Sequence, residues 1–338
     1  MNVAVCFNRV PAKLAKGESA DRISEEGAET EARAVTKALK QLGHQAALLP
    51  VGKDIDKLIE KLRAAPGQIL FNLCEGFWGD SRKELHVAAL FDLLGLAYSG
   101  SPPLCLGLTQ DKVRTKDILV RHGLPTPKYI LVKMGEQIPK TKDLTYPLFV
   151  KPRFEDASLG ITSDSLVETE TALKKRIQYI HDTYRQGALV EEYIDGREIN
   201  AAILGNGPFE VLPLSEIRFL PGLRHAIVSY DGKWLEDSPE YVRTEPVCPA
   251  QLKAKEAFLI KDVALRAYKL LECRDYARVD IRLRGDVPYI LEVNANPDIS
   301  PTAGLANAAR AAGIPYPKLI ERILAMTLKR KELLDAKP

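Results

Sequence analysis

The feature that most constrains this chain is the stretch Tyr276–Pro297, with the sequence YARVDIRLRGDVPYILEVNANP. It holds two runs of alternating apolar and polar residues on either side of a short Gly-Asp-Val turn, and this pattern predicts a β-hairpin. Because side chains two positions apart share a face of a strand, Arg278 and Asp280 are expected on one face and Val279 and Ile281 on the other. The first strand therefore has one polar and one apolar face.

The returning strand is expected to follow the same rule. Glu292 and Asn294 then lie on its polar face, and Leu291 and Val293 on its apolar face. If the hairpin is symmetric about Asp286, the two polar faces meet residue by residue. A bulge at the turn would slip this register by one residue, and the apolar face of each strand opposes such a slip.

In the symmetric register Asp280 lies opposite Glu292, and Arg278 lies opposite Asn294. Facing carboxylates on a sheet repel each other, so something must compensate them. One possibility is a hard cation such as Mg²⁺ held by the oxygens of Asp280, Glu292 and Asn294. The other is a solvated sheet face on which Arg278 neutralises the acids. The turn-rich run at residues 294–298 is typical of a site at a strand end, and it favours the metal site.

The first hundred residues predict alternating strands and helices, which is typical of a doubly wound parallel sheet that binds ligands at the carboxyl ends of its strands. The expected elements are Val3–Phe7, Ala28–Leu42, Ala46–Val51, Ile55–Ala64, Gln68–Leu73 and Lys83–Leu94. Two loops leave those strand ends, the long charged Asn8–Gly27 and the shorter Cys74–Gly79. No G-x-G-x-x-G follows the first strand and no P-loop motif occurs, so neither a dinucleotide fold nor a P-loop enzyme is supported.

The rest of the chain predicts a mixture of strands and helices after a turn cluster at Tyr98–Pro103. The expected elements are a helix Gln110–His122, strands Tyr129–Val132 and Leu148–Lys151, a helix Thr171–Arg185, strands Ala188–Ile194, Glu198–Leu204 and Glu210–Ile217, an irregular stretch Arg224–Val242, a helix Ala250–Leu271, the hairpin, and helices after Pro301 and Pro315.

Composition narrows the class of protein. A net charge of +3 and a pI of about 8.4 are too balanced to indicate binding to nucleic acid or to an anionic membrane. The five cysteines are scattered without a C-x-x-C motif, which suits a reducing cytoplasm and gives no zinc signature. No apolar run is long enough to span a membrane. We therefore expect a cytoplasmic enzyme or binding protein that acts on small molecules.

Four charged residues outside the hairpin lie where a nucleotide could be held. Lys151 ends an apolar strand and opens a loop with Ser158, and Lys112 begins a helix, so both lysines could meet phosphate. Glu191 and Glu198 flank a strand–turn–strand and could accept hydrogen bonds from a base and a ribose. Each residue alone is also explained as an ordinary surface lysine or an acidic edge strand.

Taken together, five segments resemble the ATP-grasp superfamily, and most closely its D-alanine–D-alanine ligase branch. In order they are TQDKVRTK, LFVKPRFEDASLG, LVEEYIDGREINAAILG, YARVDIRL and YILEVNANPDISP. The resemblance runs from about Val3 to Leu328. It implies an α/β ATP-grasp fold with an N-terminal doubly wound parallel-sheet domain (1–108), a small central α+β domain (109–190) and a C-terminal α+β domain carrying the hairpin (191–330).

The resemblance also implies roles for individual residues. Nucleotide contacts are implied for Lys112, Lys151, Glu191, Tyr193, Ile194 and Glu198. Metal ligands are implied at Asp280, Glu292 and Asn294, for Mg²⁺ or alternatively Mn²⁺. Catalytic roles are implied for Arg278, Lys233 and Ser158. The implied reaction joins a small-molecule carboxylate to an amine at the expense of ATP through an acyl phosphate, and relatives are often homodimers.

The chain departs from the family pattern where the substrates would bind. The differing positions are Asp156–Ser158, Trp234, Asp298, Ala303 with Thr302 beside it, and Asn72–Gly76, and either Glu25 or Glu26 could hold a substrate ammonium. We therefore expect a carboxylate–amine ligase acting on amino acids or related compounds. A true D-alanine–D-alanine ligase of peptidoglycan synthesis and a catalytically silent ATP-binding protein are the alternatives.

Overall fold

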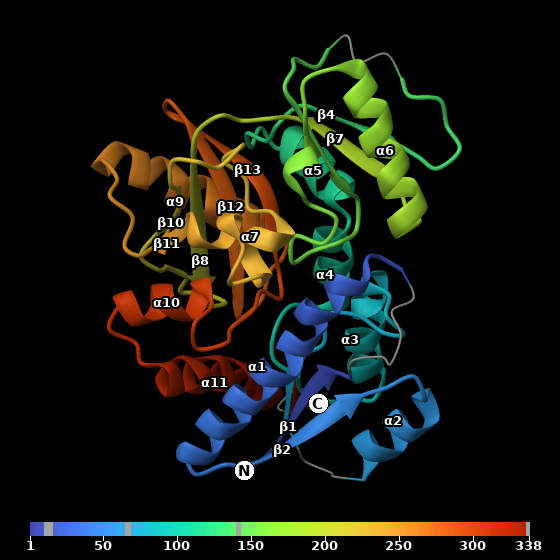
Figure 1. The fold of residues 1–338 in the computed structure, drawn as a ribbon. Coiled ribbons are helices and arrows are strands. Elements are labelled where there is room, and N and C mark those ends of the chain that lie inside the picture. Colours follow the sequence, from blue (N-terminus) through green and yellow to red (C-terminus); the bar gives the residue numbers. More distant parts are fainter. Residues whose placement is uncertain (10–15, 65–68, 140–142, 336–338) are drawn as a thin grey trace.

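The computed structural model describes residues 1–9, 16–64, 69–139 and 143–335. Its described strands form three sheets, and Figure 1 shows them in three separate regions of the molecule. The N-terminal sheet is parallel, whereas the other two are antiparallel. The expected α/β fold class with one parallel-sheet domain and two α+β domains is confirmed.

The N-terminal sheet has the order β2-β1-β3. Its strands are β1 (Asn2–Asn8), β2 (Gln45–Val51) and β3 (Ile69–Leu73), and its helices are α1 (Arg22–Gln41), α2 (Ile55–Arg63) and α3 (Glu84–Leu93). Helix α1 begins six residues before the predicted Ala28, so the expected loop is partly helical. Its first turn is polar and supported by an Arg22–Glu26 ion pair, which leaves no apolar periodicity to predict it.

The central sheet has the order β4-β7-β5-β6, with helix α6 packed on it. Its elements are β4 (Tyr129–Val132), β5 (Leu148–Pro152), β6 (Leu166–Val167), α6 (Glu170–Tyr184) and β7 (Ala188–Glu192). The predicted helix Gln110–His122 corresponds to α5 (Lys112–Arg121), and a helix that was not predicted, α4 (Pro103–Gln110), precedes it and meets it at Asp111. Asp111 has an extended backbone, and its carboxylate caps α5 by accepting from the amides of Val113 and Arg114.

The C-terminal sheet has the order β11-β10-β8-β12-β13, and β9 also pairs with β8. The strands are β8 (Arg197–Leu204), β9 (Glu210–Val211), β10 (Ser215–Phe219), β11 (Thr244–Val247), β12 (Tyr276–Arg284) and β13 (Val287–Asn294). The strand predicted over Glu210–Ile217 is therefore two strands. The stretch predicted to be irregular contains two short helices, α7 (Tyr230–Trp234) and α8 (Pro239–Val242). Three longer helices are α9 (Ala254–Leu270), α10 (Gly304–Ala311) and α11 (Tyr316–Asp335).

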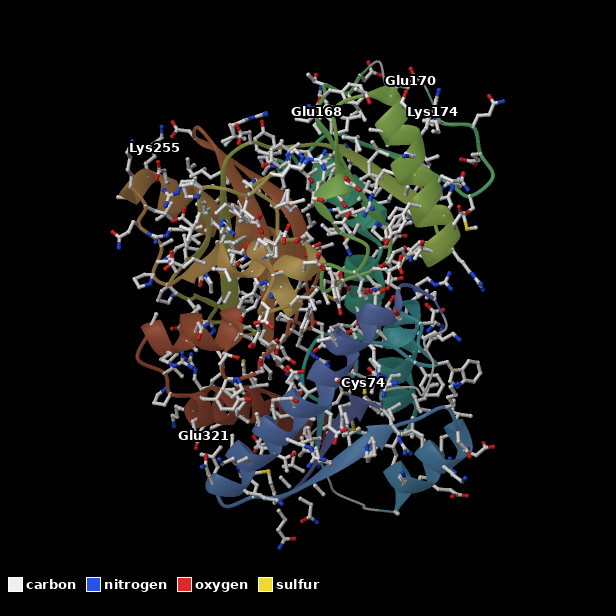
Figure 2. The ribbon with its side chains drawn as sticks, viewed as in Figure 1. Cys74, Glu168, Glu170, Lys174, Lys255 and Glu321 are labelled. Carbon is white, nitrogen blue, oxygen red and sulfur yellow. The ribbon has the colours of Figure 1, made fainter. Side chains whose placement is uncertain are left out.

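The hydrophobic cores show which parts of the molecule form one unit. One core joins α3 and α4 to the C-terminal sheet, and a second joins the N-terminal sheet to α10 and α11. The central sheet has a core of its own with α6. Charged residues such as Lys174, Lys255 and Glu321 lie at the periphery, whereas Cys74 is buried inside (Figure 2). The N- and C-terminal parts thus share a core that the central part does not.

The register of the hairpin agrees with the prediction at its functional end. Arg278 lies opposite Asn294, and Asp280 lies opposite Glu292. The pairing shifts by one residue beyond Asp280, because the turn is tighter than expected and a bulge compensates for it. As a result Ile290, and not the predicted Leu291, joins the buried face of β13.

The expected domain boundaries at 108/109 and 190/191 fall inside α4 and β7 respectively. We propose to place the first boundary at Asp111, between α4 and α5, and the second after Glu192. Helix α4 then stays with the core that it shares with α3, and β7 stays with the central sheet.

Replacing Ile281 on the buried face of β12 by alanine should lower the free energy of unfolding by about 2–5 kcal/mol, because the side chain is fully buried in the shared core. Urea unfolding measures this loss. Val287→Ala at the exposed hairpin tip is the control and should have a much smaller effect. A loss below about 1 kcal/mol for Ile281→Ala would show that the sheet face is loosely packed.

Candidate active site

Three buried charged side chains form an ionic cluster between α5 and the central sheet. The carboxylate of Glu191 on β7 lies 2.9 Å from Lys116 Nζ on one oxygen and 2.9 Å from Lys151 Nζ on the other. Burial by itself would raise the pKa of Glu191, but the two ammonium groups outweigh burial and lower the pKa. Burial lowers the pKa of Lys116 to about 8. Glu191 therefore positions two cations in a site that excludes water.

Lys116 was not predicted from the sequence. It follows Lys112 by four residues, so the two lysines share one face of α5, and this spacing could have indicated it. Lys112 Nζ donates to the backbone oxygen of Glu155 at 2.6 Å and pairs with Asp156 at 2.7 Å. The structure thus brings the predicted Lys112 to the loop that follows β5, and it brings Lys151 to Glu191.

The polar face of the hairpin is organised by Arg278. Its Nε and Nη2 donate to the two carboxylate oxygens of Asp280 at 2.7 and 2.8 Å. Asn200 on β8 and Asn294 on β13 also donate to Asp280, at 2.7 and 3.0 Å. The repulsion expected between the facing acids is therefore relieved in part by Arg278, the second of the two possibilities considered from the sequence.

Glu292 differs from Asp280 because no ion pair within 4 Å joins it to any residue that the structure describes. Burial by itself would raise the pKa of Glu292, but Lys112, Lys151 and Arg278 outweigh burial and lower the pKa to about 2. Glu292 is thus an ionised carboxylate without a direct cation. Together with the oxygens of Asp280 and Asn294 it fits a divalent metal ion. Within the described part of the chain, no group of three His, Cys, Asp or Glu side chains is placed to hold a metal ion. A metal site here would therefore include the side-chain amide of Asn294 as a ligand.

Glu198, predicted to bind ribose, pairs with a residue that sequence reasoning missed. Arg282 Nε and Nη2 donate to Glu198 at 2.9 and 2.7 Å across the β8–β12 pair. Arg282 Nη1 also contacts the Tyr193 hydroxyl at 3.2 Å and the Ile194 carbonyl at 3.5 Å. The missed signal was the alternation that places Arg282 on the same strand face as Arg278 and Asp280. Arg282 thereby ties together three predicted nucleotide contacts.

Two segments close over the predicted phosphate region. Ser158 Oγ donates to the Val228 carbonyl at 3.1 Å, and Trp234 Nε1 donates to the Ala157 carbonyl at 2.9 Å. Ala157 and Ser158 have φ angles of 53° and 61°, a left-handed conformation that costs non-glycine residues about 1–3 kcal/mol each. Through this hydrogen bond Ser158 holds residues 228–234, called here the α7 segment, in place.

Lys233 lies on this α7 segment, and within the described chain no carboxylate is within 4 Å of its ammonium group. Burial, followed by the positive charge of Arg278, lowers the pKa of Lys233. The lysine is therefore held close to a second cation without a counter-ion, as a phosphate-binding group would be.

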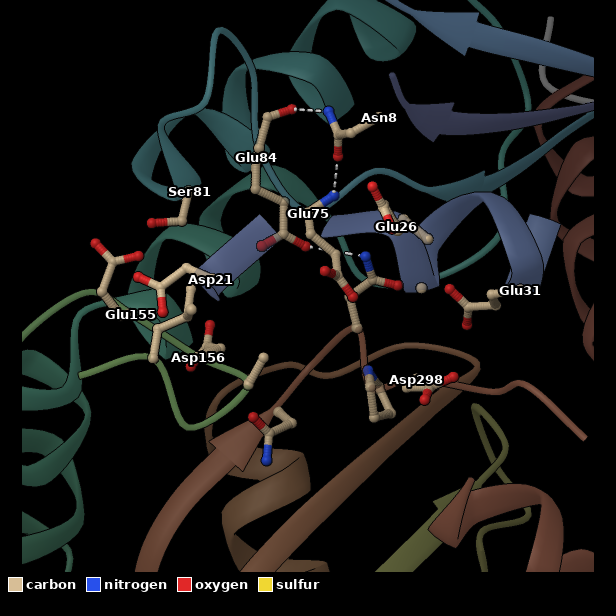
Figure 3. Close-up of a pocket in the computed structure, with 18 of the residues that line it drawn as sticks. Asn8, Asp21, Glu26, Glu31, Glu75, Ser81, Glu84, Glu155, Asp156 and Asp298 are labelled. Atoms are coloured by element: carbon tan, nitrogen blue, oxygen red, sulfur yellow. Dashed lines mark hydrogen bonds between the residues drawn. The ribbon is translucent and has the colours of Figure 1, made fainter. Parts of the chain in front are cut away.

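A cavity of about 1120 Å³ opens beside this charged region (Figure 3). Of the predicted site residues, Lys233, Arg278 and Asn294 line it. The ionic cluster at Glu191 does not, so the site divides into a buried cation cluster and an open chamber. The altered positions Asp298, Thr302 and Ala303 also line the chamber.

Of the two candidate ammonium ligands in the N-terminal region, Glu26 lines the chamber but is paired with Arg22 at 2.9 Å. The side chain of Glu25 lies outside the described ones. Tyr193 lies apart from the chamber and lines a second cavity of about 770 Å³.

The low pKa of Glu292 predicts a pH-dependent contribution to stability. This contribution is present above the ordinary pKa of 4.5 and is lost as the pH falls towards the folded value of about 2. The difference in unfolding free energy between the unmodified protein and Glu292→Gln should therefore shrink over this interval. Urea titrations at several pH values measure it, with Glu321→Gln at the periphery as the control. A difference that is constant over this pH range would contradict the assignment.

Comparison with known proteins gives the family. Residues 118–325 match the family described as "D-ala D-ala ligase C-terminus". The chain is 32% identical over 304 residues to a D-alanine–D-alanine ligase of Desulforudis audaxviator, covering 88% of this chain and 92% of that protein. It is 30% identical over 332 residues to a D-alanine–D-alanine ligase of Desulforamulus reducens, covering 94% and 98%.

A further relative is the uncharacterized protein y4sG of Sinorhizobium fredii, at 38% identity over 306 residues and 88% of each chain. The crystal structure of a D-alanine–D-alanine ligase from Bacillus anthracis complexed with ATP shares the fold, with a TM-score of 0.79 at 24% identity over 99% of both chains. In the described part of this chain, no helix has the length and apolar character needed to cross a bilayer. The chain therefore belongs to the D-alanine–D-alanine ligase family of the ATP-grasp superfamily and is an ATP-dependent ligase that forms carbon–nitrogen bonds.

Proposed function

We propose that this ligase uses ATP and Mg²⁺ to join a small-molecule carboxylate to an amine through an acyl phosphate. One observation carries the proposal. Buried lysines, an ionised carboxylate without a direct cation, and Arg278 converge where the hairpin meets a cavity large enough for two small substrates. Such an arrangement suits a reaction that brings a triphosphate and a carboxylate together.

The first step must overcome repulsion between anions. Lys112 and Lys151 lie where they can neutralise phosphate oxygens, and Lys116 with Glu191 holds Lys151 in position. Asp280, Glu292 and Asn294 would hold the metal, which supplies further charge neutralisation when bound. Lys233 adds a cation at the chamber wall, where the carboxylate substrate would meet the terminal phosphate.

The second step is attack of an amine on the acyl phosphate, which forms the amide bond and releases phosphate. Arg278 is suited to stabilise the tetrahedral oxyanion. Two of its nitrogens are fixed by Asp280, and Nη1 makes no hydrogen bond to a described residue, so it is available to substrate. The hydrogen bonds of Ser158 and Trp234 keep the α7 segment closed, which would protect the acyl phosphate from water.

A true D-alanine–D-alanine ligase is the narrower alternative, since the relatives carry that name. Against it, two positions that depart from the family pattern, Asp298 and Ala303, lie in the wall of the chamber. A protein that binds ATP without turnover is the second alternative. The simultaneous presence of Lys233, Arg278 and Glu292 in one site supports an enzyme over that alternative.

The proposal is tested by supplying ATP, Mg²⁺ and pools of amino acids, other carboxylates and amines, and by measuring phosphate release together with product masses. We expect an amide product and a stoichiometric release of phosphate, both abolished by chelation of the metal. Arg278→Ala should reduce turnover by about 100-fold or more because it removes a donor to the oxyanion. Arg284→Ala, at the exposed end of β12, is the matched control and should retain activity. Phosphate release that no carboxylate–amine pair raises above background would disprove ligase turnover.

Lys233→Ala separates catalysis from nucleotide binding. Because Lys233 is held beside Arg278 without a counter-ion, its charge should be used mainly in the transition state. We expect turnover to fall about 100-fold and nucleotide affinity by less than about threefold. Steady-state kinetics and calorimetric binding of ADP measure the two quantities, with Lys255→Ala as the control. Equal losses of turnover and affinity would place Lys233 in ground-state binding.

A further inference from the structure

The chamber beside Arg278 is strongly acidic. Ten of its described lining side chains are carboxylates, and five are lysines or arginines. The cations that belong to the reaction centre, Lys233 and Arg278, come from α7 and β12. Six of the acids come from the N-terminal part, two from the loop after β5 and one from the loop after β13 (Figure 3). The chamber therefore has a basic end at the reaction centre and an acidic remainder.

Several of the acids are already compensated within the protein. Asp156 is paired with Lys112, Glu155 with Lys16 and Glu26 with Arg22. Asp21 accepts hydrogen bonds from the Tyr184 hydroxyl and from the backbone amide of Glu18. These acids need no ligand to explain them.

Glu31 on α1 and Glu84 on α3 are different. Both side chains are more than nine-tenths buried, at 4% and 7% exposed, yet neither forms an ion pair with any residue that the structure describes. Each has one oxygen fixed, in Glu31 by the Ile299 amide at 2.7 Å and in Glu84 by the Asn296 amide group at 3.1 Å. The second oxygen of each carboxylate has no hydrogen-bond partner among the described residues. Buried carboxylates on the wall of a cavity without a cation are expensive, and a cationic ligand would compensate them.

The electrostatics of these two groups agree with a missing cation. Burial, followed by the charges of Asp298 and Glu75, raises the pKa of Glu31 well above its usual value. Burial, followed by Asp156 and Glu75, raises the pKa of Glu84 in the same way. Asp298 lies on the same wall, and it too has no ion pair within the described chain. For Glu31 and Glu84, the charged neighbours that act on the pKa are thus other acids.

These acids do not resemble a carboxylate metal site, because among the described residues no group of three His, Cys, Asp or Glu side chains is placed to hold a metal ion. The wall also presents the stacked rings of Phe77 and Trp78, 5.4 Å apart, and the ring of Trp234. Spaced carboxylates and aromatic faces suit an extended organic cation with methylene groups between its charges. A volume of about 1120 Å³ leaves room for such a molecule beside the carboxylate substrate.

We propose that the amine substrate of this ligase is a diamine or polyamine without a carboxylate, whose ammonium groups away from the reacting amine lie along the wall that carries Glu31, Glu84 and Asp298. The inference rests on the proposed ligase function and adds the class of the amine to it. The reacting ammonium group would lie at the basic end, near Arg278, and lose one proton to solvent. The neutral amine then forms the N–C bond as the C–O bond to phosphate breaks, and the released phosphate takes the second proton from nitrogen. An acceptor with a carboxylate in place of the distal ammonium group would meet the uncompensated acids and be repelled.

Binding can be tested without turnover, because the only two tryptophans of the chain, Trp78 and Trp234, both line the chamber. Tryptophan fluorescence of the full-length protein with ADP and Mg²⁺ is titrated with 1,4-diaminobutane, 1-aminobutane and 4-aminobutanoate, which have the same chain length. We expect saturable binding of the diamine at least about tenfold tighter than of the monoamine, with the amino acid weakest. Equal or tighter binding of 4-aminobutanoate, or no saturation with the diamine, would overturn the proposal.

The double substitution Glu31→Gln with Glu84→Gln keeps the fixed hydrogen bonds and removes the charges. It should weaken the diamine at least about tenfold and leave the monoamine within about threefold. Glu321→Gln is the control outside the chamber. Circular dichroism and thermal unfolding establish that the double variant is folded, and Asp298→Asn provides a second test if it is not. Unchanged diamine binding in the folded variants would exclude these acids as the site.

Turnover distinguishes this inference from the function on which it rests. ATP, Mg²⁺ and a pool of carboxylates are combined with diamines or with amino acids as the amine, and products are identified by mass. Amides of a diamine support both statements. Products formed only with amino acids as the amine would support the ligase function but contradict the proposal that the amine substrate is a diamine or polyamine. Saturable diamine binding without any product would identify a cation-binding chamber but refute the ligase proposal.

Discussion

The ion pair between Arg278 and Asp280 is the interaction on which the reaction centre depends. It allows two acidic residues to face each other across the β12–β13 ladder without a bound metal, because Asp280 is satisfied by one guanidinium and two amides. Glu292 stays ionised, and no lysine, arginine or histidine of the described ranges forms an ion pair with it. The same pair fixes Arg278 at the chamber wall with one nitrogen left for substrate. Asp280 thus stabilises the sheet through its hydrogen bonds, whereas Glu292 is the carboxylate that remains to bind a metal ion.

A second group of mutually compensating charges, Lys116, Lys151 and Glu191, lies in the central part of the molecule. Placing Lys116, Lys151 and Glu191 out of water is costly, and it is tolerated because both oxygens of the carboxylate meet an ammonium group at 2.9 Å. Such a cluster contributes little to stability compared with apolar packing, so its value lies in position. It holds cations where phosphate can replace part of the interaction with Glu191.

The arrangement of the hydrophobic cores explains where these two groups of charged residues lie. The central sheet has a separate core, whereas the N- and C-terminal parts share theirs, so Lys151 and Glu191 belong to strands packed on a different core from the hairpin. The chamber is walled by the shared unit and closed by the contacts of the α7 segment with the loop after β5. The acidic wall and the cations proposed for catalysis therefore come from segments distant in the sequence.

Alternation and turn signals alone determined the hairpin, its polar face and the pairing of Asp280 with Glu292, because a strand has a period of two and its apolar face opposes slippage. The order of motifs determined the fold class. Lys116, Arg282, Glu31 and Glu84 escaped sequence reasoning, since each is defined by a partner more than fifty residues away. Which carboxylates are compensated and which remain open to a ligand was decided only by tertiary structure, because burial and charge pairing depend on distance in space and not along the chain.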